Sequence, residues 1–580
     1  MLFNSILKPT LATLLALTVA FMLAFTACSD DDPVSPSEPD PDPEPQANLA
    51  EVMASDDDFS TLVSIVPQGL LDALETSELT VFAPTNDAFD EIPSEVLESL
   101  TPEDIELIIT YHLVEGTTLA ADVPEQTDIE SVQGELLLLQ SNNGVFVNGS
   151  AEVVKADLTA ENGVIHGIDQ VLLPSEIRKA LGATNIVDVA EEAGGFETLL
   201  AALESTELKT TLQFLEPFTV FAPNDAAFAE LPEGTLENLS AEELTQILTY
   251  HVLDSQVMAG DLQPQQDPAT LQGESLYIEA ENGAVTINNS ATVTSADIEA
   301  TNGVIHVVDA VLLPDAFGTV VDNAIKRFDF TTLVDTVVDA ELAEALQGDG
   351  PFTVFAPTND AFADLPDGLL ESLTPDQIQE ILLYHVVEGN IASGDLDGAQ
   401  AAASMSGENL YITADNGVTV NGSSSVVAAD IGSSNGIIHA IDEVLIPNEF
   451  LNIVQIAQKN FDLTTLVELV VEADLAETLS GNGPFTVFAP INSAFEDIAD
   501  DLEGLTQEDI SDILKYHVIA DRIESGDIPA GTTNIETVNG EEVTILNDNG
   551  SVTVDGANVI TVDLSGENGV IHLIDAVILP

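Results

Sequence analysis

The chain has almost no cysteine and very little positive charge. Its 580 residues include one cysteine, no tryptophan, and 10 lysines and arginines against 102 aspartates and glutamates, so the formal net charge is −92. A single cysteine excludes an intramolecular disulfide, a thiolate metal cluster and a catalytic thiol in the folded domains. A surface this acidic repels nucleic-acid phosphates and anionic lipid headgroups, so neither is expected as a direct partner.

The acidity belongs to folded domains, because 45% of the residues are hydrophobic and the mean hydropathy is +0.21, whereas disordered chains lack apolar content. Two interpretations remain: capture of calcium, or solubility in concentrated salt. An EF-hand calcium loop needs Asp-x-Asx-x-Asx-Gly followed by a glutamate, and the sequence contains no such loop. The pattern therefore favours an acidic, halophilic protein, although weak calcium binding of another kind stays open.

The N-terminus has the features of an export signal. Residues 1–27 carry one cation, Lys8, and then an apolar run that ends in Phe25-Thr26-Ala27-Cys28. This ending resembles the lipobox of bacterial lipoproteins, which implies a signal peptide over 1–27 and a lipid on Cys28. The alternative is an uncleaved N-terminal anchor with an incidental thiol.

Residues 28–45 are rich in aspartate and proline, which predicts a stiff, extended stalk. The acidic triplet directly after Cys28 resembles the surface-export signal of Bacteroidetes-type lipoproteins. We therefore expect an exported, lipid-anchored protein, on the outer membrane or cell surface rather than on its periplasmic face. Contact with the membrane is expected only through the lipid.

The rest of the chain is a fourfold repeat in which all eight histidines fall into two motifs. The Tyr-His motif occurs at Tyr111-His112, Tyr250-His251, Tyr384-His385 and Tyr516-His517. The Gly-(Val/Ile)-Ile-His motif ends at His166, His306, His439 and His572. The two histidines of a copy are 54 or 55 residues apart, and successive copies are 132 to 140 residues apart. Because this period matches a whole domain rather than a solenoid repeat, the chain is an array of globular domains.

Each copy has the pattern of helices followed by β structure. An amphipathic helix opens the copy, and the buried strand Thr-Val-Phe-Ala-Pro follows it. Asn86, Asp225, Asn359 and Asn492 come directly after this strand, where we expect them to be N-caps of a short helix. The next helix begins with capping sequences such as Thr101-Pro102. Alternating residues and tight turns complete the copy.

The first histidine lies on the apolar face of its helix, seven residues after an isoleucine or leucine. We predict that both histidines of each copy are buried and structural, with their nitrogens bonded to backbone or neighbouring side chains. The four tyrosines adjoin the same apolar stripe, so from spacing alone they belong either to the edge of the core or to a contact surface.

The three blocks together resemble the fasciclin domain: Thr-Val-Phe-Ala-Pro-Thr-Asn-Asp-Ala-Phe (80–89 and 353–362), Tyr-His, and Asn-Gly-Val-Ile-His-x-Ile-Asp-x-Val-Leu-Leu-Pro. Copies two and four depart in the first block. The resemblance implies an α+β chain of four tandem domains, each a wedge-like, seven-stranded β-sandwich with packed helices. We place these domains at 46–174, 183–314, 317–447 and 450–580.

The resemblance also implies cell adhesion or matrix binding, and in animal members the Tyr-His helix is tied to integrin binding. Tyr111, Tyr250, Tyr384 and Tyr516 are therefore candidate adhesion contacts. The expected partner is a matrix polysaccharide or a cell-surface protein.

Catalysis and metal binding find little support in the sequence. Each copy has two histidines, no cysteine, and neither His-x₃-His nor His-Glu-x-x-His, so no zinc site is expected. Gly-x-Ser-x-Gly occurs only once, at residues 432–436 in the third copy, and the sequence has no glycine-rich phosphate loop, so we expect no catalytic residue and no cofactor. Asp169, Asp309, Asp442 and Asp575, three residues after the second histidine, are expected to close a turn rather than orient a base. The predicted function is a surface-anchored adhesion or matrix-binding lipoprotein, and the alternative is a structural spacer of the periplasm or cell surface without a ligand.

Overall fold

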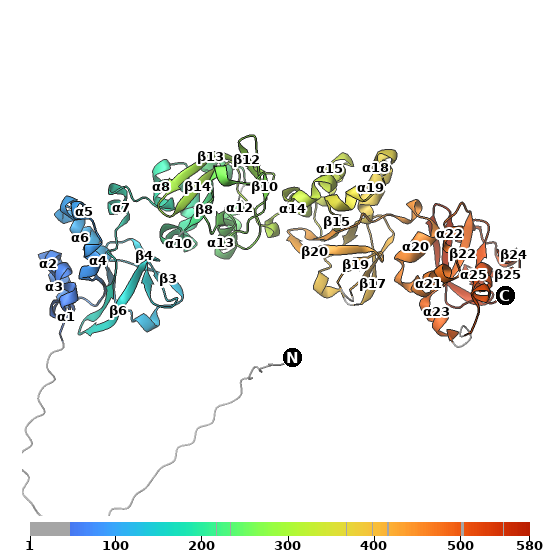
Figure 1. Cartoon of the computed structure of the whole chain (residues 1–580), viewed down its shortest axis with the longest axis horizontal. Helices are drawn as coiled ribbons and strands as arrows, with labels where there is room; N and C mark the ends of the chain where they lie inside the picture. Colours follow the sequence, from blue (N-terminus) through green and yellow to red (C-terminus); the bar gives the residue numbers. More distant parts are fainter. Residues whose placement is uncertain are drawn as a thin grey trace, which may run out of the picture. The chain divides into compact units, whose positions relative to one another are not determined.

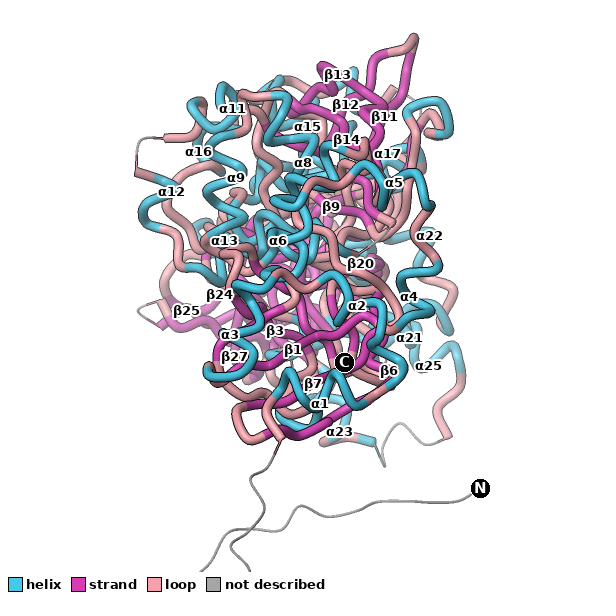
Figure 2. The backbone as a smooth tube through the Cα atoms, turned by 90° about the vertical axis from the view of Figure 1, so that its left-hand side faces the viewer, coloured by secondary structure: helices cyan, strands magenta, loops and turns pink. Residues whose placement is uncertain are grey.

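The computed structural model describes residues 47–580, apart from 216, 233, 367, 397, 415–416, 500–503 and 549. The predicted signal peptide (1–27), the lipid site Cys28 and the stalk (28–45) lie outside the described residues. From residue 48 onward the chain consists of four copies of one α+β unit, in which helices come first and most of the strands follow (Figures 1 and 2).

The elements of the four copies have the following bounds. The first copy contains α1 (Leu49–Ser55), η1 (Asp57–Phe59), α2 (Ser60–Ile65), α3 (Gln68–Thr76), β1 (Leu79–Pro84), α4 (Asn86–Asp90), α5 (Ser94–Ser99), α6 (Pro102–Tyr111), β2 (Leu113–Glu115), η2 (Ala120–Asp122), β3 (Gln126–Glu130), β4 (Leu136–Gln140), β5 (Phe146–Val147), β6 (Ala151–Ala160) and β7 (Gly163–Ile168). After α7 (Ser175–Ala180), the second contains α8 (Ile186–Ala193), α9 (Glu197–Glu204), α10 (Leu208–Phe214), β8 (Phe218–Pro223), α11 (Asp225–Ala229), α12 (Thr235–Asn238), α13 (Ala241–Tyr250), β9 (Val252–Leu253), η3 (Ala259–Asp261), β10 (Gln265–Gln266), β11 (Ile278–Glu281), β12 (Ala284–Ile287), β13 (Ala291–Ala300) and β14 (Gly303–Val308).

The later copies repeat this order. The third contains η4 (Asp315–Phe317), α14 (Val320–Lys326), η5 (Phe328–Phe330), α15 (Thr331–Asp339), α16 (Ala343–Leu346), β15 (Phe352–Pro357), α17 (Asn359–Ala363), α18 (Leu369–Ser372), α19 (Pro375–Tyr384), β16 (Val386–Glu388), η6 (Ser393–Asp395), β17 (Ala399–Ala403), β18 (Asn409–Thr413), β19 (Thr419–Val420), β20 (Ser424–Ser433) and β21 (Gly436–Ile441). The fourth contains η7 (Asn448–Phe450), α20 (Ile453–Lys459), η8 (Phe461–Leu463), α21 (Thr464–Glu472), α22 (Ala476–Leu479), β22 (Phe485–Pro490), α23 (Asn492–Glu496), α25 (Gln507–Tyr516), β23 (Val518–Ile519), η9 (Ser525–Asp527), β24 (Gly531–Glu536), β25 (Glu542–Asp548), β26 (Ser551–Val554), β27 (Ala557–Gly566) and β28 (Gly569–Ile574).

All four copies share one seven-stranded order, which in the first copy is β2-β1-β7-β6-β5-β4-β3. The pair β1–β7 is parallel and its neighbours are antiparallel. The ten-residue strand β6 pairs with β5 near its start and with β7 further on, and its register shifts twice along the way. Such bulges bend a strand, so β6 carries the sheet from one half of the wedge to the other.

The core has two parts in each copy. In the third copy, one apolar cluster joins α14, α15 and α19 to β15 and β21, and another fills the β half around Phe355 and Tyr384. Figure 1 shows α15, α18 and α19 on one side of this copy and β17 and β19 on the other. The strand β15 lies between the two clusters, which explains why five of its six residues are buried instead of alternate ones.

The Tyr-His helix forms as the sequence predicts. In α6, Thr101 is the N-cap, its hydroxyl accepts a hydrogen bond from the backbone N–H of Asp104, and the Asp104 carboxylate accepts one from the Thr101 backbone N–H. This reciprocal capping box satisfies two backbone donors that the helix leaves open. The helices α13, α19 and α25 begin with the same arrangement.

The short helix after the buried strand begins one residue earlier than we predicted. Its N-caps are Thr85, Asn224, Thr358 and Ile491, not Asn86, Asp225, Asn359 and Asn492. Asn86 is the first helical residue, and its side chain accepts a hydrogen bond from the Thr61 backbone N–H and donates one to the Asp57 carbonyl. The predicted N-cap residue therefore fastens α4 to the preceding helical segment.

Candidate functional site

The three sequence motifs meet at the phenylalanine of the buried strand. In the first copy, Phe82 on β1 is paired with His166 on β7, and their ring centroids are 5.6 Å apart. The backbone N–H of Phe82 donates to the carbonyl oxygen of His112 at 3.0 Å. The same contacts recur at Phe221, Phe355 and Phe488. The motifs that define the repeat therefore form one buried cluster in each copy.

The first histidine of each copy closes its helix onto the last segment of the domain. His112 Nδ1 is 2.7 Å from the Ile108 carbonyl oxygen, and the Leu172 backbone N–H donates to Nε2 at 2.9 Å. A carbonyl accepts only and a backbone N–H donates only, so the ring is neutral with its hydrogen on Nδ1. Burial lowers the pKa of His112 to about 4.

The second histidine adopts the opposite tautomer. Nδ1 of His166 accepts a hydrogen bond from the Asp157 backbone N–H at 3.3 Å, and Nε2 lies 2.8 Å from the Thr118 carbonyl oxygen. Asp157 lies in the bulged part of β6 with φ of 56°, and its carboxylate accepts a hydrogen bond from the Ala120 backbone N–H. The left-handed conformation turns the Asp157 N–H toward the imidazole, so the bulge and the histidine depend on each other.

All eight histidines are at most 3% exposed, which confirms the prediction that they are buried. The hydrogen bonds of the first copy recur in the others at His251 and His306, His385 and His439, and His517 and His572. Both ring nitrogens are engaged in every case, so these rings hold the fold and present no free nitrogen to a substrate. Among the described residues, no group of three or more histidine, cysteine, aspartate or glutamate side chains is arranged to hold a metal ion.

The tyrosines of the Tyr-His motif lie inside the domain, which corrects their assignment as adhesion contacts. Tyr111, Tyr250, Tyr384 and Tyr516 are 0%, 1%, 0% and 6% exposed. The Tyr384 hydroxyl donates to the Asn409 carbonyl and accepts from the Asn421 side chain. Burial raises the pKa of the Tyr516 hydroxyl to about 12. The tyrosine hydroxyls form hydrogen bonds within the β half of the domain. A partner that binds the folded domain therefore does not contact them.

Two polar positions of the repeat, Asn162 and Asp169, form structural hydrogen bonds that the sequence did not predict. Asn162, which begins the second histidine motif, accepts a hydrogen bond from the Leu49 backbone N–H and donates to the Leu74 and Ser77 carbonyls. Its counterparts are Asn302, Asn435 and Asn568. The aspartates three residues after the second histidine accept backbone hydrogen bonds from the neighbouring long strand, as Asp169 does from Glu152. Recurrence at constant spacing was the only signal of the asparagine's role.

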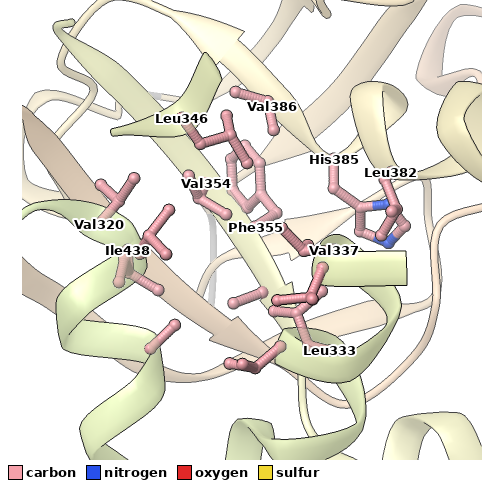
Figure 3. Close-up of a pocket in the computed structure, with 15 residues that line it drawn as sticks. Val320, Leu333, Val337, Leu346, Val354, Phe355, Leu382, His385, Val386 and Ile438 are labelled. Atoms are coloured by element: carbon pink, nitrogen blue, oxygen red, sulfur yellow. The ribbon is translucent and has the colours of Figure 1, made fainter. Parts of the chain in front are cut away.

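His385 also borders an apolar cavity of about 50 Å³ in the third copy (Figure 3). Val320 and Leu333 form part of one side, and Phe355 and Ile438 lie on the sheet beneath. The fourth copy has a cavity of about 40 Å³ at the same place, beside His517.

The few cations are all committed to ion pairs. Each of the nine lysines and arginines in the described part of the chain lies within 4.0 Å of a carboxylate. Six of them lie in the segments that join one copy to the next or in the early helices of a copy, namely Arg178 and Lys179 in α7, Lys209 in α10, Lys326 in α14, Arg327 directly after α14, and Lys459 in α20. Most of the acidic side chains in that part of the chain therefore have no cation beside them. None of the described helices is long and apolar enough to cross a membrane.

A repeated α+β unit whose shared phenylalanine, tyrosine and histidines build its core defines a tandem array of modules. The Fasciclin domain profile matches residues 57–174, 194–314, 328–447 and 461–580, and the chain belongs to this family. The matches end where our predicted domains end. The profile matches begin about eleven residues after our predicted domain starts. In the first copy this leaves out α1, whose Leu49 and Met53 pack in the same core as β1.

The relatives include long animal proteins and a short bacterial one. The chain is 30% identical over 512 residues to the transforming growth factor-beta-induced protein ig-h3 of Sus scrofa, covering 86% of this chain and 73% of that protein. It is 28% identical to human periostin, covering 86% and 60%. Protein sll1483 of Synechocystis is 42% identical over 160 residues, covering 27% and 87%. A solved FAS1 domain pair from the insect cell adhesion molecule fasciclin I is 20% identical with a TM-score of 0.35, covering 44% of this chain and 98% of that chain.

Proposed function

We propose that the protein is a surface-anchored adhesion or matrix-binding lipoprotein that uses its fasciclin domains as four similar binding modules. The observation that carries the proposal is the fourfold repetition of a domain from this family. Modules in series raise the strength of binding to a repetitive polymer even when each contact is weak. A matrix polysaccharide or a cell-surface protein fits this mode of binding.

The chemistry of the interior supports binding rather than catalysis. Every histidine is neutral, buried and bonded through both nitrogens to backbone groups. A general base needs a nitrogen that can reach a substrate proton, and these rings do not offer one. Contacts with a partner therefore fall to the outer surface.

One surface position stands out because it is apolar and exposed in all four copies. Val132, Leu271, Met405 and Val538 are 45%, 40%, 36% and 44% exposed. Each lies in a tight turn whose backbone N–H donates to the strand directly after the Tyr-His motif, as Val132 does to Leu113 at 2.7 Å. We propose these four residues as contacts in place of the buried tyrosines, because a partner with a periodic structure meets the same apolar group on every module.

The test is binding of the ectodomain, residues 46–580, to arrays of polysaccharides and matrix proteins in 2 M KCl. A quadruple serine variant at positions 132, 271, 405 and 538 should lose at least tenfold in avidity while its melting temperature stays within a few degrees. A matched control replaces Val154, Val427, Ile560 and Val562, which are 44–59% exposed, by serine. Equal losses in both variants would refute the assignment of the contacts.

A structural spacer without a ligand is the alternative. Protease treatment of intact cells distinguishes an adhesion protein on the cell surface from a periplasmic spacer, because the protease cleaves only a protein that is exposed on the surface. A spacer would also bind nothing on the arrays at any salt concentration. Absence of binding, together with protection from protease, would favour the periplasmic spacer.

A further inference from the structure

The third and fourth domains contain the same apolar cavity, next to the first histidine motif. In the third domain it lies between α14, α15, β15 and β21, and in the fourth between α20, α21, β22 and β28. The two cavities have matching linings. The cavity of the third domain is lined by Val334, Val337 and Leu346, and that of the fourth by the corresponding residues Val467, Val470 and Leu479. Two independent copies of one void indicate a property of the sequence rather than a local irregularity.

The second domain carries leucines at two positions where the cavity of the third is lined by valines. Thr198 and Thr332 both donate their backbone N–H to the side chain at the start of the next short helix, which fixes the register between α9 and α15. In this register Leu200 and Leu203 of the second domain stand where the third has Val334 and Val337. Each valine is one carbon shorter than leucine. Leu203 is 4% exposed and packs in the core, so a valine at this position occupies less of the core than a leucine does.

The cavity has no free polar group. Its only polar side chain is His385, whose Nδ1 contacts the Ile381 carbonyl and whose Nε2 accepts from the Leu445 backbone N–H. Figure 3 shows the imidazole beside aliphatic side chains. Water in a buried cavity needs two to four polar partners, so this one favours an apolar occupant.

Its size and opening limit the occupant. A volume of about 50 Å³ is about three to five times the roughly 10–15 Å³ that one water needs, which corresponds to about three to five non-hydrogen atoms. Val338 lines the cavity and is 56% exposed, so the cavity reaches the surface of α15. An alkyl chain can therefore enter by its end and leave its head outside.

We propose that the third and fourth domains each bind the end of an alkyl chain from an uncharged or cationic amphiphile. The net charge of −92 repels a carboxylate head and attracts a cationic one. This site is separate from the exposed turn residues and goes beyond adhesion. The two proposals can be tested separately. The ectodomain could bind alkyl chains without binding a matrix polymer, or bind the polymer without binding alkyl chains.

The first test uses xenon with the ectodomain in 2 M KCl, followed by ¹²⁹Xe NMR. Val337→Leu should remove one saturable site, Val470→Leu the other, and the double variant both. Leu203→Val in the second domain is the matched reverse change and should add a site. The proposal is overturned if the double variant binds as much xenon as the unmodified protein, or if Leu203→Val adds nothing.

The second test uses thermal shift with n-alkanols from ethanol to hexanol. Affinity should rise roughly threefold to fourfold for each added methylene until the cavity is filled, and level off near four carbons. Hexylamine should bind more tightly than hexanoate at 0.1 M KCl, and 2 M KCl should reduce the difference. Equal response in the Val337→Leu, Val470→Leu variant would show that the alkanols act elsewhere and would contradict the proposal.

Discussion

Phe82 and His166 stand side by side on the parallel strands β1 and β7, with ring centroids 5.6 Å apart. The pair joins two motifs that are more than eighty residues apart in the chain, and it recurs in each domain. Because the strand between the two core clusters carries this phenylalanine, a change to either ring disturbs both halves of the domain.

His385→Ala should destabilise the third domain by roughly 2–4 kcal/mol, because it leaves a cavity and two unpaired backbone groups. These groups are the Ile381 carbonyl and the Leu445 N–H. Hydrogen exchange of peptides from residues 317–447, followed by mass spectrometry, measures the effect in the intact chain. Unchanged protection together with loss of ligand binding would instead make His385 a functional contact.

Acid should weaken each domain through its first histidine. Burial lowers the pKa of His112, His251, His385 and His517 to about 4. The neutral ring therefore contributes stability that is fully present above the ordinary value of about 6.5 and is lost as the pH falls from there through 4. The loss is about 3 kcal/mol per domain at pH 4.

Urea unfolding at pH 7 and pH 4.5 measures this dependence. Protonation of carboxylates relieves repulsion over the same range and acts in the opposite direction, so the comparison needs a variant. His385→Gln removes the titrating group, and its third domain should show a smaller loss between the two pH values. An equal loss in both proteins would contradict the assignment to His385.

Gly436→Ala should unfold the third domain. A Cβ at Gly436 would lie 2.1 Å from the Phe352 carbonyl oxygen, where β21 begins its pairing with β15. This clash can be removed only if the two central strands move apart. We expect that movement to lower the free energy of unfolding by at least 3 kcal/mol. Gly432→Ala on the neighbouring strand is the control, because a Cβ there meets no atom within 4 Å. Similar melting curves for the two variants would disprove the steric argument.

The melting temperature should rise steeply between 0.1 and about 2 M KCl. The 102 acidic side chains are balanced by only ten lysines and arginines, which leaves a net charge of −92, and the Debye length falls from about 10 Å at 0.1 M to about 3 Å at 1 M. Calcium at 1 mM should not replace KCl. A melting temperature that is flat in KCl and raised sharply by calcium would revive the calcium interpretation of the acidic surface.

Cys28→Ser should release the protein from membranes or leave its precursor uncleaved. The prediction rests on the lipobox resemblance at residues 25–28, which lie outside the described part of the structure. Membrane fractionation and the mass of the mature N-terminus measure the outcome. If the variant is processed and fractionates as before, the anchor is a different one.

Much of the fold could be predicted because local signals and burial agree. The capping box of Thr101 and Asp104 formed as expected, and the apolar run 79–84 became the buried strand β1. The N-cap at Asn86 was wrong because a threonine directly before it, Thr85, supplies the same chemistry one position earlier. Neighbouring cap residues are not distinguished by composition, and tertiary contacts select between them.

The sequence by itself determined that there are four domains, that they are acidic, and that both histidines of each belong to the core, since spacing and amphipathic pattern encode these properties. The tertiary structure alone decided which hydrogen bonds the rings make, and hence their opposite tautomers, because Leu172 and Thr118 reach His112 and His166 only through the fold. It also decided that Tyr111 lies inside, beneath Asn148 and Leu136. A residue at the edge of an apolar stripe is buried or exposed according to what packs over it, and that depends on strands distant in the chain.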